Sequence, residues 1–142
     1  LALLLRGEAL AEILVCPPPN VSLPEDVEAA LRGGPGALRF IEDVETALRA
    51  SDAVMMAPYD VSDIGEVPAS GYRSARTTPE SHRITAEKVA RTGARALLYH
   101  PLPRQDEIDP SCDGLPVAMY FEQVRLSKFM RMAVLEQALG LA

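Results

Sequence analysis

The sequence lacks several features that would place it in a specialised class of proteins. Its 142 residues include only two cysteines, Cys16 and Cys112, which lie far apart and form neither a disulfide framework nor a zinc signature. No apolar run approaches the roughly 18 residues that a membrane-spanning helix needs. Basic residues form no cluster, and the net charge is −6. We therefore expect a reduced, cytoplasmic setting, with neither nucleic acid nor a membrane as partner.

The best-known catalytic motifs are also missing. The chain contains no G-x-G-x-x-G, P-loop, G-x-S-x-G or H-E-x-x-H pattern. This argues against a dinucleotide-dependent dehydrogenase, a nucleoside triphosphatase and a serine hydrolase, and we expect neither a cofactor nor a metal. The chain does have one-domain length, and its hydrophobic content of 48% suffices for one core.

Short apolar runs alternate with helical patterns along the chain. Strands are predicted near 12–16, 37–41, 52–57 and 95–100, and helices near 1–11, 22–32, 42–49, 84–91 and 117–140. This alternation predicts an α/β fold: a three-layer, mostly parallel, Rossmann-like sheet with helices on both faces.

The apolar stripe of the last predicted helix changes phase between Val124 and Phe129. We therefore predict a break near 126–128, which divides this segment into a short helix and a longer terminal one. The methionines Met119, Met130 and Met132 are interpreted as core filler.

Parallel sheets bind ligands beyond the carboxyl ends of their strands. Of the four predicted ends, 57–60 and 100–104 carry the most unusual residues. In the second of these, prolines on both sides of Leu102 remove backbone donors and stiffen the turn. The carbonyls of Pro101 and Leu102 could then serve as rigid acceptors for an NH₂ group. The alternative is a stiff strand exit with a packed histidine.

The other charged candidates have two readings each. Asp60 and Asp63, beside Tyr59, could bind a cationic group, or they could serve turn chemistry. Four basic residues of the long loop 58–83 could clamp an anion or simply be solvated: Arg73, Arg76, His82 and Arg83. The acidic residues Asp106, Glu107 and Asp109 could act as acid/base groups, but we interpret them as a solvated loop or cap.

Three segments, 100–108, 120–124 and 131–135, resemble the C-terminal part of aspartate carbamoyltransferases in order and spacing. Upstream, 15–19, 42–48, 51–54 and 84–89 resemble the second domain of the same family. The resemblance covers essentially the whole chain. It implies that residues 1–142 form an amino-acid-binding domain that lacks its first strand and the carbamoyl-phosphate domain, so that the sheet is incomplete at its N-terminal end.

The resemblance implies transfer of a carbamoyl group from carbamoyl phosphate to the amine of aspartate, the committed step of pyrimidine synthesis. It also implies a homo-trimer or higher oligomer with sites at subunit junctions. Leu102 would offer its backbone carbonyl, and the peptide to Pro103 would be cis. The catalytic residues assigned on this basis are His100, Pro101, Leu102, Pro103 and Arg104. The assigned substrate-binding residues are Pro58, Tyr59, Asp60, Arg76 and Arg83.

The chain departs from the family at the acceptor site. Pro58 and Asp60 stand where the family has an Arg-x-Gln that grips the aspartate carboxylate. Three hypotheses follow. The chain is half of an aspartate carbamoyltransferase and inactive alone, or it belongs to a carbamoyltransferase with a different, cationic acceptor. The third is a catalytically dead homologue kept for binding or assembly.

Overall fold

The computed structural model describes residues 12–17, 23–33, 37–58 and 78–141. Its strands are β1 (Glu12–Val15), β2 (Ala37–Phe40), β3 (Ala53–Met55) and β4 (Leu97–Tyr99). Its helices are α2 (Glu25–Gly33), α3 (Val44–Ala50), α4 (Ala86–Thr92), the 3-10 turn η2 (Pro110–Cys112) and α5 (Tyr120–Ala138). The helix predicted at 1–11 lies outside the described residues.

All the strand pairs are parallel. Strand β1 pairs with β2, with Val15 opposite Phe40, and β3 pairs with β4, with Met55 opposite Tyr99. The predicted α/β class and parallel pairing are confirmed. Within the described residues, however, the strands form two separate pairs rather than one continuous sheet. Sequence alternation predicts parallel strands, but it does not say which strands become hydrogen-bonded neighbours.

Local sequence sets the ends of the short helices. Asp43 begins α3 by accepting a hydrogen bond from Thr46 N at 2.8 Å. Thr85 begins α4 through Lys88 N at 3.2 Å. Gly93 ends α4 with φ of 62°, a left-handed conformation that glycine adopts without a steric penalty.

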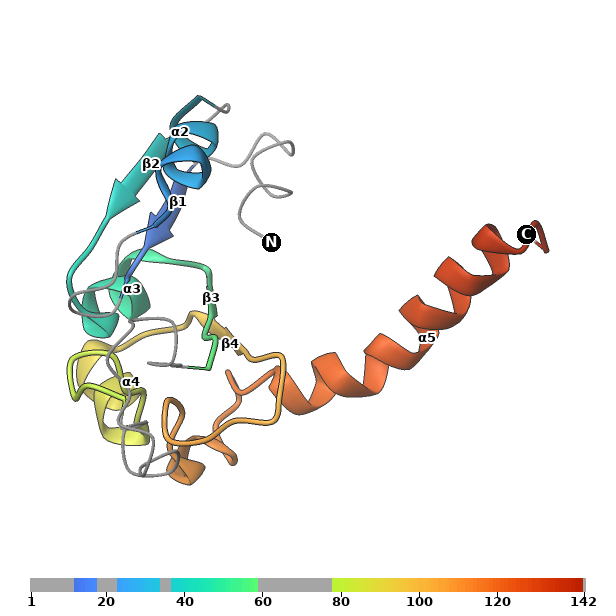
Figure 1. Ribbon diagram of the computed structural model, residues 1–142. Coiled ribbons are helices and arrows are strands. Elements are labelled where there is room, and N and C mark those ends of the chain that lie inside the picture. Colours follow the sequence, from blue (N-terminus) through green and yellow to red (C-terminus); the bar gives the residue numbers. More distant parts are fainter. Residues whose placement is uncertain (1–11, 18–22, 34–36, 59–77, 142) are drawn as a thin grey trace, which may run out of the picture.

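The core lies against the face of the pair β3–β4 that carries Val54 and Leu98, whereas Met55 and Leu97 on the opposite face are exposed. Helices α3 and α4 pack together, α3 also contacts β3, and the start of α5 packs against β4 (Figure 1). The buried residues that make up this core are Val44, Leu48, Ile84, Val89, Leu98, Ile108, Cys112 and Tyr120.

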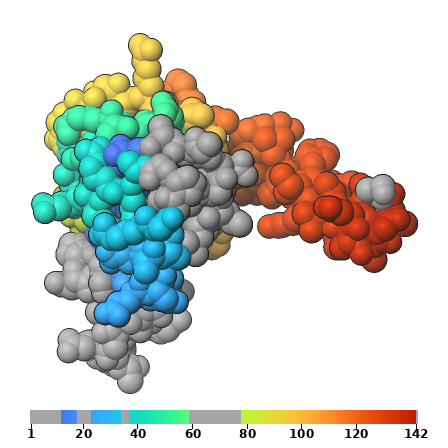
Figure 2. Space-filling view, turned by 90° about the horizontal axis from the view of Figure 1, so that it is seen from above, coloured from blue at the N-terminus to red at the C-terminus, as the bar shows by residue number. Residues whose placement is uncertain are grey.

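Helix α5 leaves the core after its first turn and extends away from the rest of the molecule (Figure 2). The predicted break near 126–128 is wrong, because α5 is continuous over 19 residues. No proline or glycine interrupts it, and the Ser127 hydroxyl donates back to the Val124 carbonyl at 2.7 Å. Among the described residues, no helix combines the length and apolar character needed to cross a membrane.

The prediction that the methionines fill the core is wrong for two of them. Met130 is 68% exposed and Met132 is 46% exposed. Tyr120 is the one buried residue of α5, since the helix projects beyond the elements that could cover it. An apolar stripe predicts burial only if a packing partner is present.

Candidate active site

The backbone turns sharply where β4 ends. The N–H of His100 donates to Gln123 Oε1 of α5 at 3.0 Å, and the N–H of Leu102 donates to His100 Nδ1 at 2.8 Å. Leu102 has φ of 47°, and the Leu102–Pro103 peptide is cis, as the family resemblance implied. A leucine in the left-handed region is disfavoured and persists only where its surroundings impose it.

A buried pair supports this turn from below. His100 is 0% exposed and Glu107 is 1% exposed, and His100 Nε2 lies 2.7 Å from Glu107 Oε1. Because Nδ1 accepts from Leu102, the network assigns the proton to Nε2, which donates to Glu107. The second oxygen of Glu107 accepts from Gln105 N at 3.1 Å. Glu107 is therefore no solvated loop residue, and the sequence interpretation was wrong there.

The turn presents carbonyl acceptors at its surface that no described backbone group bonds. Among the described residues, no backbone N–H donates to the carbonyl of Pro101 or Leu102. Pro101 and Pro103 are exposed, and Leu102 is partly exposed. A rigid loop with unpaired carbonyls, and with prolines in place of donors, is suited to accept hydrogen bonds from an NH₂ group.

Arg104 points into a second polar cluster rather than into open solvent. Its Nη2 donates to Asp113 Oδ2 at 2.7 Å, and its Nη1 donates to the Tyr120 hydroxyl at 3.1 Å. The guanidinium also lies over the rings of Tyr120 and Phe121. The Arg104 bond holds the pKa of Asp113 below its usual range. Sequence reasoning missed this partnership, because nine residues separate Arg104 from Asp113.

The long loop is described only in part. Tyr59, Asp60, Arg73 and Arg76 lie outside the described residues. Pro58 is exposed just beyond β3. Asp106 accepts hydrogen bonds from the backbone N–H and the hydroxyl of Thr78, at 2.9 and 2.7 Å. These bonds connect Thr78 to the segment that follows the β4 turn.

Arg83 and His82 have internal partners. Arg83 pairs with Asp109, whose pKa is lowered chiefly by the Ser111 backbone N–H. His82 Nε2 lies 2.8 Å from the Pro17 carbonyl oxygen, and His82 Nδ1 lies 2.9 Å from the Ser81 hydroxyl oxygen. These two side chains are therefore committed to the protein rather than to an open anion clamp.

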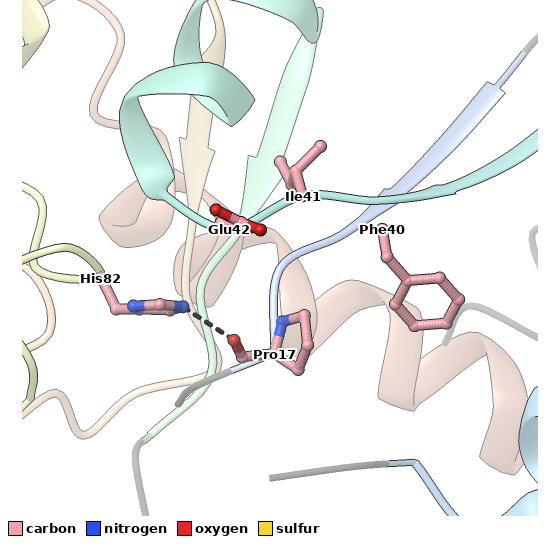
Figure 3. A pocket seen from close by; sticks show the side chains of 5 residues that line it. All are labelled: Pro17, Phe40, Ile41, Glu42 and His82. Atoms are coloured by element: carbon pink, nitrogen blue, oxygen red, sulfur yellow. Dashed lines mark hydrogen bonds between the residues drawn. The ribbon is translucent and has the colours of Figure 1, made fainter. Parts of the chain in front are cut away.

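A separate cavity of about 400 Å³ opens at the carboxyl ends of β1 and β2 (Figure 3). Pro17, Phe40, Ile41, Glu42 and His82 line it. Its histidine is already bonded to Pro17, as the dashed line in Figure 3 marks. The β4 turn is the better candidate site, because its carbonyl acceptors are still available.

Cys16 lies beside that cavity, with its Sγ 3.4 Å from His82 Nε2. Burial, and secondarily the Asp43 carboxylate, raise the pKa of the Cys16 thiol to about 11. A thiol with so high a pKa is a poor nucleophile near neutral pH. Within the part of the chain that the structure describes, no group of three or more His, Cys, Asp or Glu side chains is placed to hold a metal ion.

Comparison with known proteins finds sequences that are similar to part of this chain. The catalytic subunit of aspartate carbamoyltransferase from Methanospirillum hungatei is 48% identical over 59 residues, which is 42% of this chain and 20% of that protein. The subunit from Hyperthermus butylicus is 48% identical over 61 residues, 42% of this chain and 19% of that protein. No family model matches.

Solved structures extend the similarity to most of the chain. The catalytic subunit of M. jannaschii aspartate transcarbamoylase superposes with a TM-score of 0.73 and 26% identity, over 89% of this chain and 39% of that one. Aspartate transcarbamoylase from Trypanosoma cruzi in complex with carbamoyl phosphate superposes with a TM-score of 0.69 and 25% identity, over 89% of this chain and 40% of that one. The chain is similar to the aspartate carbamoyltransferases. It resembles the C-terminal domain of that family, and it spans about 40% of the length of these two solved relatives.

Proposed function

We propose that this chain is the amino-acid-binding half of a carbamoyltransferase, which moves a carbamoyl group from carbamoyl phosphate to the amine of an amino acid in pyrimidine biosynthesis. The observation that carries the proposal is the rigid β4 turn, whose Pro101 and Leu102 carbonyls accept from no backbone N–H of the described segments. Such acceptors can hold the NH₂ of a carbamoyl group and align it with the attacking amine. Catalysis would then come from positioning and charge stabilisation rather than from a covalent intermediate.

We propose further that the chain is inactive on its own. The departing phosphate develops charge that cationic donors must stabilise. Two of the described cations are already engaged, Arg104 by Asp113 and Arg83 by Asp109. The phosphate contacts would come from a carbamoyl-phosphate domain, and the turn 100–104 would face the reacting groups through its Pro101 and Leu102 carbonyls.

The test compares this 142-residue chain with the longest natural protein that contains it. Each is assayed for carbamoyl-aspartate formed from carbamoyl phosphate and aspartate. We expect turnover in the longer protein and none above background in the chain alone. Turnover by the isolated chain would refute its inactivity. An inactive longer protein, tested with every acceptor below, would instead support the third hypothesis, a homologue kept for binding or assembly.

A second acceptor class is favoured by Pro58. This residue is exposed beyond β3 and has no N–H to donate, although it stands where the resemblance expects a carboxylate-gripping arginine. We propose that Asp60 makes aspartate a poor acceptor and favours a cationic one, with Tyr59 and Arg76 as further binding residues, whereas Arg83 is held by Asp109. Two like charges about 4 Å apart repel by about 4 kcal/mol at an effective dielectric near 20.

Calorimetric titration of the longer protein, with carbamoyl phosphate present, decides between these acceptors. Ornithine should bind more tightly than aspartate, and Asp60→Asn should reduce that preference. Glu66→Gln is the matched control, because it removes one carboxylate charge from the same loop at a position that is not a binding candidate. Tight aspartate binding that survives Asp60→Asn would contradict the cationic acceptor.

We also propose that the protein works as a homo-trimer or higher oligomer. Several large apolar side chains of α5 are more than half exposed, among them Phe129, Met130 and Leu135, and exposed apolar surface of this kind favours association. Analytical ultracentrifugation should give a mass above one chain. Phe129→Glu should lower that mass, whereas Arg125→Glu, on a polar position of the same helix, should not. A monomeric wild type at all concentrations would exclude the oligomer.

A further inference from the structure

We propose that His100 and Glu107, which we call the His100 clasp, are positioning residues that aim the Pro101 carbonyl and hold the Leu102 peptide for the ligand. The inference rests on the proposed function, and it assigns to this buried pair a task that neither side chain could perform by touching substrate. His100 is 0% exposed and Glu107 is 1% exposed.

The hydrogen-bonding capacity of the clasp is used internally. His100 Nδ1 accepts from Leu102 N, and its Nε2 donates to Glu107. Each Glu107 oxygen has a partner, one in His100 and the other in Gln105 N. A histidine whose two ring nitrogens are both occupied in the core has no free nitrogen for proton transfer to a ligand. The remaining role is to hold the backbone.

Peptide geometry links the clasp to the exposed carbonyls. The Leu102 N–H points into the core toward Nδ1. In a planar trans peptide the N–H and the preceding C=O point in opposite directions, and the Pro101–Leu102 peptide is not among the cis bonds. The bond to His100 therefore directs the Pro101 carbonyl away from the imidazole. It also fixes the nitrogen end of Leu102, whose φ of 47° a leucine would not keep unaided.

Two isosteric substitutions separate the two bonds of His100. In His100→Asn the side-chain oxygen occupies the place of Nδ1, so the acceptor for Leu102 is kept and the donor to Glu107 is lost. In His100→Gln the amide reaches Glu107 in place of Nε2, and the acceptor for Leu102 is lost. His82→Gln is the matched control, because it changes the other buried histidine, which is bonded to Pro17 instead.

The first readout is nuclear magnetic resonance of the 142-residue chain. We expect the Nε2–H tautomer of His100, and a Leu102 amide protected from hydrogen exchange. His100→Gln should speed that exchange at least about tenfold, whereas His100→Asn and His82→Gln should leave it close to wild type. The Leu98 amide, in β4, reports whether each variant is folded. An Nδ1–H tautomer, or equal Leu102 exchange in wild type and His100→Gln, would overturn the clasp.

The second readout is kinetic and uses the longer natural protein with carbamoyl phosphate and the acceptor that it turns over. Misplaced carbonyls should lower kcat by about 10- to 100-fold in His100→Gln, with KM for the acceptor changed less than about threefold. His100→Asn should recover most of kcat. An unchanged kcat in His100→Gln would reduce the clasp to a structural feature and overturn the positioning role. A wild type without any activity would refute the proposed function instead, and the resonance data alone would then decide whether the clasp exists.

Discussion

Replacing Tyr120 by phenylalanine tests the polar cluster that anchors α5 beneath the β4 turn. The tyrosine ring is fully buried, and its hydroxyl donates to Asp113 Oδ1 at 2.6 Å while accepting from Arg104 at 3.1 Å. Tyr120→Phe removes the hydroxyl and keeps the ring in the core. A hydrogen bond to a charged group contributes about 1.5–3 kcal/mol. Asp113 keeps its bidentate Arg104 partner and is 37% exposed, so we expect a loss near the lower limit, about 1.5 kcal/mol.

The same variant should change how stability depends on pH. Burial, and secondarily the hydrogen bond to Asp113, raise the pKa of Tyr120 from an ordinary value near 10 to about 12. The folded state therefore favours the protonated phenol. The stabilisation that the protonated Tyr120 gives the folded state is fully present below the pKa of about 10 in the unfolded chain. It is lost as pH rises toward the folded-state pKa of about 12. A pKa shift of two units corresponds here to less than about 3 kcal/mol in the free energy of unfolding, because solvent reaches Asp113 and screens its interaction with Tyr120.

The assay is urea unfolding of wild type and Tyr120→Phe at a series of pH values from neutral to alkaline. The difference between the two free energies of unfolding isolates Tyr120, because the other titrating groups are common to both proteins. We expect wild type to be the more stable at neutral pH, with a melting temperature about 5 °C higher, and to lose this advantage between pH 10 and 12. Parallel pH curves for the two proteins would refute the reasoning.

Three further predictions concern other parts of the chain. Leu98→Ala, at a fully buried position of β4, should cost about 2–5 kcal/mol in denaturant unfolding; a cost below about 1 kcal/mol would mean that the core is not packed as described. Asp43→Ala removes the cap of α3 and should cost about 1 kcal/mol at neutral pH. Because the Thr46 N–H lowers the pKa of Asp43, this difference should disappear as pH falls through the lowered value, as unfolding in acid would check. Cys16, half-buried and with its pKa raised to about 11, should be alkylated slowly at about pH 8 and quickly once the chain unfolds; mass spectrometry that found rapid labelling in the folded chain would contradict the raised pKa.

The sequence by itself determined the elements whose signals are local. Four apolar runs predicted four strands, and all four are present in parallel pairs. The helices predicted near 42–49 and 84–91 correspond to α3 and α4, whose ends are set locally, because Asp43, Thr85 and Gly93 bond to backbone atoms within four residues. The H-P-L-P-R string singled out 100–104 as a rigid turn at a strand exit, since proline restricts the backbone wherever it occurs.

Only the tertiary structure decided the partners of those elements. Glu107 reads as one acid of a polar loop, yet it is buried against His100, because the chain between them folds back under β4. The resemblance assigns Arg104 to catalysis, yet its guanidinium is bonded to Asp113 and Tyr120. The phase change within α5 predicted a break, but the helix is continuous, and its apolar residues beyond the first turn are exposed. Each of these outcomes depends on which distant surfaces meet, and a one-dimensional pattern of residue types does not contain that information.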